Sequence, residues 1–232
     1  MMKPSFSVVV PAAGIGKRVG SDIPKQYLPI LGKTIIEHSL QPFLDHVEIQ
    51  RVIVSIAKND QWFQHLAISK HPKLQIVEGG KERVDSVLSA LQHLHAEDWV
   101  LVHDAARPCI QKNDIDKLIT HVKKSNCGAM LAYRVRDTMK RSDPSKQIQK
   151  TIDRENLWHA LTPQLFNNQE LINAIKQVEQ QHLITDEASA IEMAGGDVFI
   201  IEGRSDNLKV TQSEDLLLAE FYLSNFHTKE EK

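Results

Sequence analysis

Short apolar runs alternate with amphipathic stretches along almost the whole chain, and this rhythm limits the folds that the sequence can adopt. Several runs are continuously apolar, as in parallel strands that are covered on both faces. The pattern is typical of an α/β protein with helices packed on a mostly parallel sheet. The predicted strands are Phe6–Pro11, Arg51–Ala57, Leu74–Val77, Trp99–His103, Ala129–Val135 and Asp197–Ile201. The predicted helices are Thr34–Phe43, Gln61–Ser69, Arg83–His93, Asn113–Lys123, Gln169–Gln180, Asp186–Ala194 and Glu214–Tyr222.

The size and composition of the chain favour one domain. The 232 residues and 41% hydrophobic content allow a sizeable core, so we expect residues 1–232 to form a single α/β domain. The formal net charge of -2 argues against a nucleic-acid partner, and two cysteines are too few for a disulfide framework. No segment approaches the roughly 18 apolar residues of a membrane span, and the start resembles a strand rather than a signal sequence. We therefore expect a cytoplasmic protein with no membrane partner.

Residues 136–154 break the rhythm of the chain. Two polar, partly alternating segments surround a turn at Asp143 and Pro144, which predicts a β-hairpin that projects from the domain. An exposed hairpin is only marginally stable unless it packs on something, so this arm is expected to mediate dimerisation. The alternative is a surface loop without regular structure.

The first predicted strand leads into a loop of small and basic residues, PAAGIGKRVG at 11–20. Small residues let the backbone approach a phosphate chain closely, and the backbone amides can donate hydrogen bonds to it. Two common phosphate motifs are excluded by spacing, because Val19 and Tyr27 stand where glycines would be needed. Arg18 and Lys25 add positive charge, which favours a triphosphate ligand. A solvated basic turn is the alternative.

Asp104 follows the predicted strand Trp99–His103 directly. Open α/β sheets bind their ligands at the carboxyl ends of their strands, so this carboxylate is expected to lie at a ligand site. Mg²⁺ is usually held by one or two carboxylates together with phosphate oxygens, and Asp104 is therefore the candidate metal ligand. A turn-forming aspartate is the alternative for an isolated residue of this kind.

Together these segments resemble the 2-C-methyl-D-erythritol 4-phosphate cytidylyltransferase family, and the resemblance runs through nearly the whole chain. The matching segments are PAAGIGKRVG (11–20), PKQYL (24–28), GGKERVDSV (79–87), VHDAARP (102–108), VRDTMKR (135–141), DRENLWHALTPQ (153–164), TDEASAIE (185–192) and EGRSDNLKVT (202–211). The resemblance implies a Rossmann-like, three-layer α/β/α nucleotidyltransferase fold with a mostly parallel twisted sheet and a projecting hairpin arm. It also implies an activity, the joining of CMP from CTP to 2-C-methyl-D-erythritol 4-phosphate in isoprenoid precursor biosynthesis, with release of pyrophosphate.

The resemblance assigns the nucleotide to the first half of the chain and to one late loop. Arg18, Lys25 and Lys209 match the catalytic cations near the α-phosphate, and Asp104 matches the Mg²⁺ ligand. Asp206, near Lys209 in sequence, is a further candidate for the metal. The residues that match nucleotide-binding positions are Ala12, Ala13, Gly14, Gly16, Gly79, Gly80, Ser86 and Ala105.

The acceptor is assigned to hydroxyl and guanidinium side chains, both of which suit phosphate oxygens. The matching positions are Arg107, Thr138, Arg154, Thr162 and Thr185. In the family the arm clasps the neighbouring subunit, so the resemblance implies a homodimer joined through residues 136–154. The chain departs from the family pattern at Lys81, where many relatives carry Asp.

The expected mechanism is a direct in-line displacement by the acceptor phosphate, which is already an anion and needs no general base. Two other functions remain open: transfer of another nucleotide to a sugar or polyol phosphate, and nucleotide binding by a regulator without catalysis. The joint presence of Lys25, Asp104 and Lys209 argues against the regulator, because a binder needs no charge aimed at a reacting phosphorus.

Overall fold

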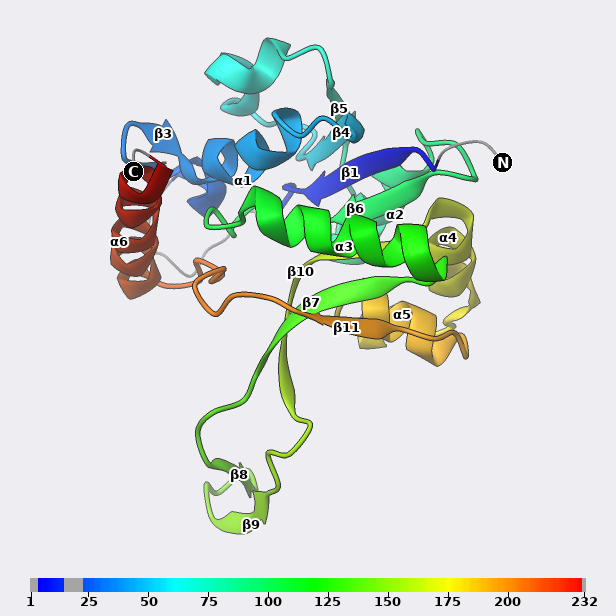
Figure 1. Cartoon of the computed structure of the whole chain (residues 1–232), viewed down its shortest axis with the longest axis vertical. Coiled ribbons are helices and arrows are strands. Elements are labelled where there is room, and N and C mark those ends of the chain that lie inside the picture. The colour runs from blue at the N-terminus through cyan, green and yellow to red at the C-terminus, as the bar shows by residue number, and fades with distance from the viewer. Residues whose placement is uncertain (1–3, 15–22, 231–232) are drawn as a thin grey trace.

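A computed structural model describes residues 4–14 and 23–230, and within them the chain forms a seven-stranded sheet in the order β11-β7-β10-β6-β1-β4-β5 (Figure 1). The strands are β1 (Phe6–Pro11), β4 (Ile49–Ile56), β5 (Leu74–Glu78), β6 (Trp99–Val102), β7 (Ala129–Arg134), β10 (Trp158–Asn167) and β11 (Phe199–Glu202). Among the described strands of this sheet, β10 alone runs antiparallel to its neighbours. The mostly parallel sheet predicted from the sequence is confirmed.

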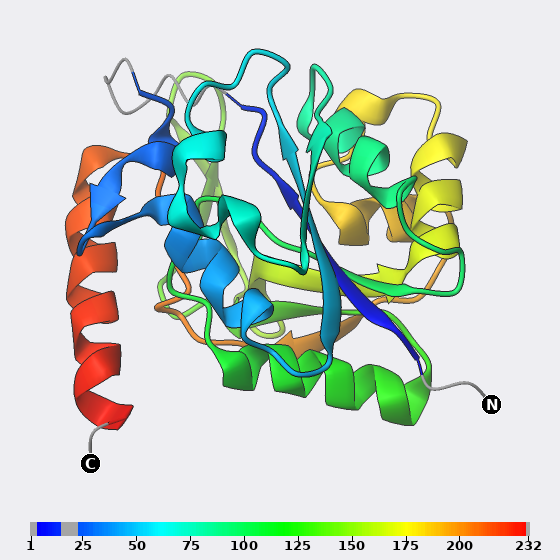
Figure 2. The same ribbon diagram turned by 90° about the horizontal axis from the view of Figure 1, so that it is seen from above.

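Helices cover both faces of this sheet, which confirms the three-layer arrangement (Figure 2). On one face lie α1 (Ile35–Leu44) and α3 (Lys112–Ser125), and on the other lie α2 (Arg83–Leu91), α4 (Asn168–Gln177) and α5 (Glu187–Met193). Each face has its own apolar core because consecutive residues of β1 point to opposite sides: Val8 joins the first cluster and Val9 the second. A last helix, α6 (Ser213–Glu230), packs at the edge of the molecule on a smaller cluster.

One predicted element is wrong, and one strand of the main sheet was not predicted. The missed strand is β10, which contains Pro163, a residue that lacks a backbone N–H and is rare in central strands. The pairing of β10 with β7 is interrupted at this point, between Ala160 and Gln164. The helix predicted at Gln61–Ser69 is instead two short 3₁₀ turns, η3 (Phe63–His65) and η4 (Ala67–Lys70).

The predicted arm is a hairpin that projects from the body of the molecule (Figure 1). Its strands, β8 (Met139–Ser142) and β9 (Ile148–Ile152), pair antiparallel and form a small sheet of their own. At the predicted turn, Asp143 N–H donates to the carbonyl of Gln147 at 3.0 Å. A second, very short hairpin, β2 (Pro29–Ile30) and β3 (Lys33–Thr34), leads into α1. The arm leaves the body at the end of β7 and returns as β10.

Candidate active site

A cavity of about 310 Å³ lies at the carboxyl ends of β1 and β6, where the sequence predicts a ligand site. Its walls come from five parts of the chain: the loop after β1, the 3₁₀ turn η2 (Lys25–Tyr27), the start of α2, the loop after β6 and the loop before α6. Of the residues predicted to act on the nucleotide, those that line it are Ala12, Ala13, Gly14, Lys25, Gly80, Ser86, Asp104, Ala105 and Lys209. Gly16 and Arg18 lie outside the described residues.

The described part of the loop after β1 is held by a buried glutamine that the sequence analysis did not select. The Nε2 atom of Gln26 donates to the carbonyl of Ala12 at 2.8 Å and to that of Gly14 at 3.1 Å. Ala12 N–H in turn donates to the carbonyl of Ser55 at the end of β4. The backbone of residues 12–14 is therefore held by three hydrogen bonds. The PKQYL segment contained this residue, but nothing in its pattern indicated the partner.

The two glycines at 79 and 80 are required for close packing around the cavity. A Cβ atom added to Gly79 would lie 2.6 Å from Ala13 Cβ, and one added to Gly80 would lie 2.1 Å from Asp85 Cβ. These separations are shorter than any real carbon contact, so a larger residue would push the loop after β1 away from α2. The Gly80 N–H donates to Ser86 Oγ at 3.1 Å, and this bond fixes the backbone beside the start of α2.

Asp104 is the centre of a buried ionic cluster. Its Oδ2 atom lies 2.9 Å from Lys209 Nζ and 3.3 Å from Arg107 Nε, and its Oδ1 atom lies 3.3 Å from Arg83 Nε. Burial alone would disfavour the ionised carboxylate. The positive charges of Arg83, Lys209 and Arg107 outweigh that effect and hold the pKa of Asp104 well below its usual range. Asp104 is therefore ionised at neutral pH.

Arg83 was not predicted as a site residue, although it links Asp104 to a second buried carboxylate. Its Nη1 and Nη2 atoms lie 2.6 Å and 3.0 Å from the two carboxylate oxygens of Glu187. Burial opposes the charge of Arg83, but Glu187 and Asp104 outweigh it and raise the pKa of this guanidinium. Arg83 is the first residue of α2 and Glu187 the first of α5, so the pair joins two helix starts beside the cavity.

Lys25 and Lys209 reach the cavity from opposite ends of the sequence. Lys25 Nζ donates to the carbonyl of Val210 at 3.1 Å, and Val210 N–H donates to the carbonyl of Ala106 at 2.8 Å. These bonds tie the loop before α6 both to the loop after β6 and to the segment after β1. The two lysines and Asp104 therefore line one cavity, although 184 residues separate Lys25 from Lys209 in the sequence.

Hydrogen bonds through Thr162 and His103 hold the backbone of Asp104 in place. Asp104 N–H donates to Thr162 Oγ1 at 3.1 Å, and this hydroxyl lies 3.0 Å from Nδ1 of His103. His103 Nε2 lies 3.2 Å from the carbonyl of Arg107, which can only accept, so Nε2 carries the proton and Nδ1 accepts from Thr162. Burial lowers the pKa of His103 to about 4 and keeps the ring neutral. These hydrogen bonds fasten the end of β6 to the centre of β10.

The structure places the predicted acceptor residues in separate positions. Arg107 and Thr162 are buried beside Asp104, and Arg107 Nη1 donates to the carbonyl of Asn207 at 2.8 Å. Thr185 is exposed just before α5, and its N–H donates to Ser189 Oγ at 3.1 Å. Thr138 and Arg154 belong to the two ends of the arm and are exposed. Within one chain, the residues predicted to bind the acceptor are therefore not gathered into one pocket.

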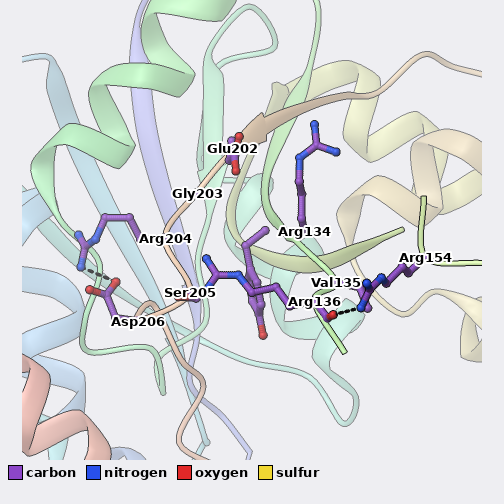
Figure 3. A pocket seen from close by; sticks show the side chains of 10 residues that line it. Arg134, Val135, Arg136, Arg154, Glu202, Gly203, Arg204, Ser205 and Asp206 are labelled. Carbon is purple, nitrogen blue, oxygen red and sulfur yellow. Dashed lines mark hydrogen bonds and ion pairs between the residues drawn. The ribbon is translucent and has the colours of Figure 1, made fainter. Parts of the chain in front are cut away.

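A second cavity, of about 650 Å³, lies at the base of the arm and is lined by Arg154 (Figure 3). Figure 3 shows Arg154 beside Arg136, to whose carbonyl it donates, and Arg204 turned toward Asp206 on the other side. Arg204 Nη2 lies 2.6 Å from Asp206 Oδ1. Asp206, a further candidate for the metal in the sequence analysis, thus lines the arm cavity and is held by Arg204 rather than pointing to Asp104.

The donor set around Asp104 fits Mg²⁺ that is bound mainly through a substrate. In the part of the chain that the structure describes, no group of three or more His, Cys, Asp or Glu side chains could hold a metal ion. A single ionised carboxylate beside a phosphate-sized cavity nevertheless suits Mg²⁺, which keeps few protein ligands and takes phosphate oxygens. Among the described helices, none is long and apolar enough to cross a membrane.

The α/β/α fold, the small-residue loop after β1 and the ionised aspartate after β6 define this chain as a protein of the nucleotidyltransferase class. The model of the 2-C-methyl-D-erythritol 4-phosphate cytidylyltransferase family matches residues 6–225. The chain belongs to this family.

Individual relatives of the chain agree with the family model. A 2-C-methyl-D-erythritol 4-phosphate cytidylyltransferase of Pseudoalteromonas atlantica is 54% identical over 223 residues, which are 96% of each chain. The Vibrio cholerae enzyme of the same name is 51% identical over 224 residues, 95% of this chain and 97% of the relative. The crystal structure of the Francisella tularensis enzyme of that name superposes with a TM-score of 0.80 at 36% identity, covering 94% of this chain and 99% of the other.

Proposed function

We propose that this chain joins CMP from CTP to 2-C-methyl-D-erythritol 4-phosphate and releases pyrophosphate. Membership of the family supports this activity. The observation that carries the proposal is the convergence of Lys25, Lys209 and Asp104 on one cavity whose wall includes the backbone of residues 12–14. Fixed charges at such a position stabilise the negative charge that develops on a phosphorus during transfer.

The proposed chemistry is a direct in-line displacement. A phosphate oxygen of the acceptor forms a bond to the α-phosphorus of CTP, and the bond from that phosphorus to the oxygen bridging to the β-phosphate breaks. Pyrophosphate leaves with the electron pair. The attacking oxygen is already an anion at neutral pH, so no general base is required and no histidine is assigned a catalytic role. His103 in particular is buried, neutral and committed to Thr162 and the Arg107 carbonyl.

Three charged residues of the cavity have proposed tasks in this reaction. Lys25 and Lys209 hold and neutralise the phosphate oxygens around the α-phosphorus. Asp104 is the protein ligand of Mg²⁺, which would supply additional charge neutralisation to the triphosphate when bound. The backbone of Ala12 and Gly14, fixed by Gln26, presents the loop after β1 to the phosphate chain. Arg18 is proposed as a further cation on the α-phosphate by the family resemblance.

The proposed functional unit is a homodimer joined through the arm at 136–154. Two observations support it: Ile148 and Met139 are exposed on the arm, 62% and 37% respectively, and the arm strands pair with each other rather than with the main sheet. Thr138 and Arg154 would then serve the acceptor site of the partner subunit, because neither lines the Asp104 cavity of its own chain. An isolated hairpin gains stability when a second surface covers it.

The deciding experiment measures pyrophosphate release with CTP, UTP, GTP and ATP against a panel of phosphorylated polyols. We expect turnover with CTP and 2-C-methyl-D-erythritol 4-phosphate above every other pair. Turnover with another nucleotide or a sugar 1-phosphate would establish the related transferase function instead. Tight CTP binding with no turnover on any acceptor would establish a regulator. The same panel tests Lys81, since the Lys81→Asp variant should leave the order of nucleotides unchanged if backbone groups read the base.

A further inference from the structure

The geometry points to Glu187 as a positioning residue: by holding the fork of Arg83, it keeps one oxygen of Asp104 accessible to a divalent cation. The inference rests on the proposed function, because it takes Asp104 as the metal ligand. Glu187 itself touches neither Asp104 nor, in the proposal, the substrate. Its effect on the metal passes through Arg83.

The two carboxylate oxygens of Asp104 have different numbers of ion-pair partners. Oδ2 faces both Lys209 Nζ, at 2.9 Å, and Arg107 Nε, at 3.3 Å. Among the described residues that form ion pairs with Asp104, Oδ1 faces Arg83 alone, through Nε at 3.3 Å. That separation is long for a hydrogen bond between charged groups. Oδ1 is therefore the oxygen that a cation can approach with the smaller rearrangement.

Glu187 determines which edge of Arg83 faces this oxygen. Its two carboxylate oxygens take Nη1 and Nη2 of Arg83 at 2.6 Å and 3.0 Å, the two-point geometry in which guanidinium and carboxylate bind most strongly. The side chain of Glu187 is 3% exposed, and Arg83 is the cation that pairs with it. Both residues start helices, and the backbone of each is fixed. The fork of Arg83 is thus turned to Glu187, and only Nε remains for Asp104.

Removal of the Glu187 charge should release the fork toward Asp104, its other carboxylate partner in the described structure. A guanidinium that gripped both oxygens of Asp104 would compete directly with a metal ion. Groups that orient a metal ligand typically change metal affinity by about 10- to 100-fold when they are mutated. We therefore expect Glu187→Gln to weaken divalent cation binding by about 10-fold or more.

The test measures Mn²⁺ binding to the full chain in the presence of CTP, from the electron paramagnetic resonance signal of free Mn²⁺. Glu187→Asp is compared with Glu187→Gln, because it keeps the charge but shortens the reach to Arg83. A positioning role predicts weakened binding in both variants. A purely long-range charge effect predicts weakening in Glu187→Gln alone, and that result would overturn the inference. Glu192→Gln, which removes an exposed carboxylate from the same helix, is the matched control and should bind as the unmodified chain does.

Further measurements separate this inference from the proposed function. Asp104→Asn should abolish the CTP-dependent Mn²⁺ site. If that variant bound Mn²⁺ normally, the metal ligand itself would be wrongly assigned. If Asp104→Asn lost the site while both Glu187 variants kept full affinity, the positioning role alone would be refuted. Should Glu187→Gln fail to fold, as judged by circular dichroism, Glu187→Asp carries the test alone, and unchanged Mn²⁺ affinity there would equally refute the role.

Discussion

The Asp104 cavity and the arm at 136–154 both carry charged side chains, but these side chains have opposite surroundings. At the cavity, Asp104 is buried and is held by cations from distant segments, Arg83, Lys209 and the neighbouring Arg107. In the arm, nearly every side chain is exposed, charged and apolar alike. The comparison teaches that a buried charge needs partners supplied by the whole fold, whereas the exposed side chains of the arm leave a surface that the proposed second copy would cover.

The substitution Asp104→Asn tests the importance of the buried charge most directly, because it keeps the shape of the side chain and removes its charge. We expect turnover at saturating Mg²⁺ to fall by ~10³-fold, because the proposed metal site loses its carboxylate and three cations lose their common partner. Steady-state pyrophosphate release measures the effect. Asp197→Asn, an exposed carboxylate remote from the cavity, is the control. Full activity of Asp104→Asn with an unchanged metal requirement would place the ligand elsewhere.

Lys25→Ala and Lys209→Ala test whether each cavity cation acts on the reacting phosphorus. Each variant should lower turnover by ~10²-fold or more without unfolding, in line with the loss of one preorganised charge contact. Turnover and thermal unfolding are measured together, with the exposed Lys124→Ala as the matched control. Near-normal turnover in either cavity variant would remove that lysine from the mechanism.

The buried histidine beside Asp104, His103, should make the free energy of unfolding depend on pH. His103 is neutral in the folded state, where its pKa is about 4, but titrates near 6.5 when unfolded. As pH falls below 6.5 the unfolded state takes up the proton first, so stability is lost, by about 2 kcal/mol between pH 7 and pH 5. Denaturant unfolding across this range measures the loss. The His103→Gln variant should show a flatter profile, and an equal slope in both proteins would contradict the assignment.

A substitution in the arm should have the smallest effect on the free energy of unfolding. Ile148→Asp places a charge on the exposed strand β9, and its effect on the unfolding free energy should stay within about 0.5 kcal/mol, as for most surface changes. If the proposed dimer forms through the arm, analytical ultracentrifugation should show dimers of the unmodified chain and monomers of Ile148→Asp. Gln149→Asp, at an exposed position of the same strand, adds the same single charge and is the control. A dimer that persisted in Ile148→Asp would move the interface away from this strand.

Most of the fold could be predicted because local pattern and global structure agree. The continuous apolar runs became parallel strands, and the hairpin turn at Asp143 formed where the sequence indicated. The strand β10 escaped prediction because Pro163 interrupts its run, and only the neighbours β6 and β7 justify a strand there. The helix predicted at Gln61–Ser69 failed because bonds between residues three apart, such as Leu66 N–H to the Phe63 carbonyl, close 3₁₀ turns instead.

Some residues of the candidate site could be selected from the sequence, and others could not. Small residues after β1 and an aspartate after β6 have positions that follow from strand order alone, so Gly14 and Asp104 could be selected from the sequence. Arg83 and Glu187 could not, because an ionic residue in the first turn of a helix usually interacts with solvent or with its own helix. Their pairing depends on two helices meeting across the sheet edge, which no local pattern encodes. Gln26 escaped for the same reason, since its partners are backbone carbonyls of a preceding loop.

Because β10 runs antiparallel to β7, the arm between these two strands can vary in length and contacts. The chain leaves the sheet at the carboxyl end of β7, the same edge that carries Asp104, and re-enters it through β10 without disturbing the order of the other strands. An insertion at this point can lengthen, shorten or change its contacts while the framework stays constant. The contacts that the arm makes can therefore change while the residues around Asp104 stay the same.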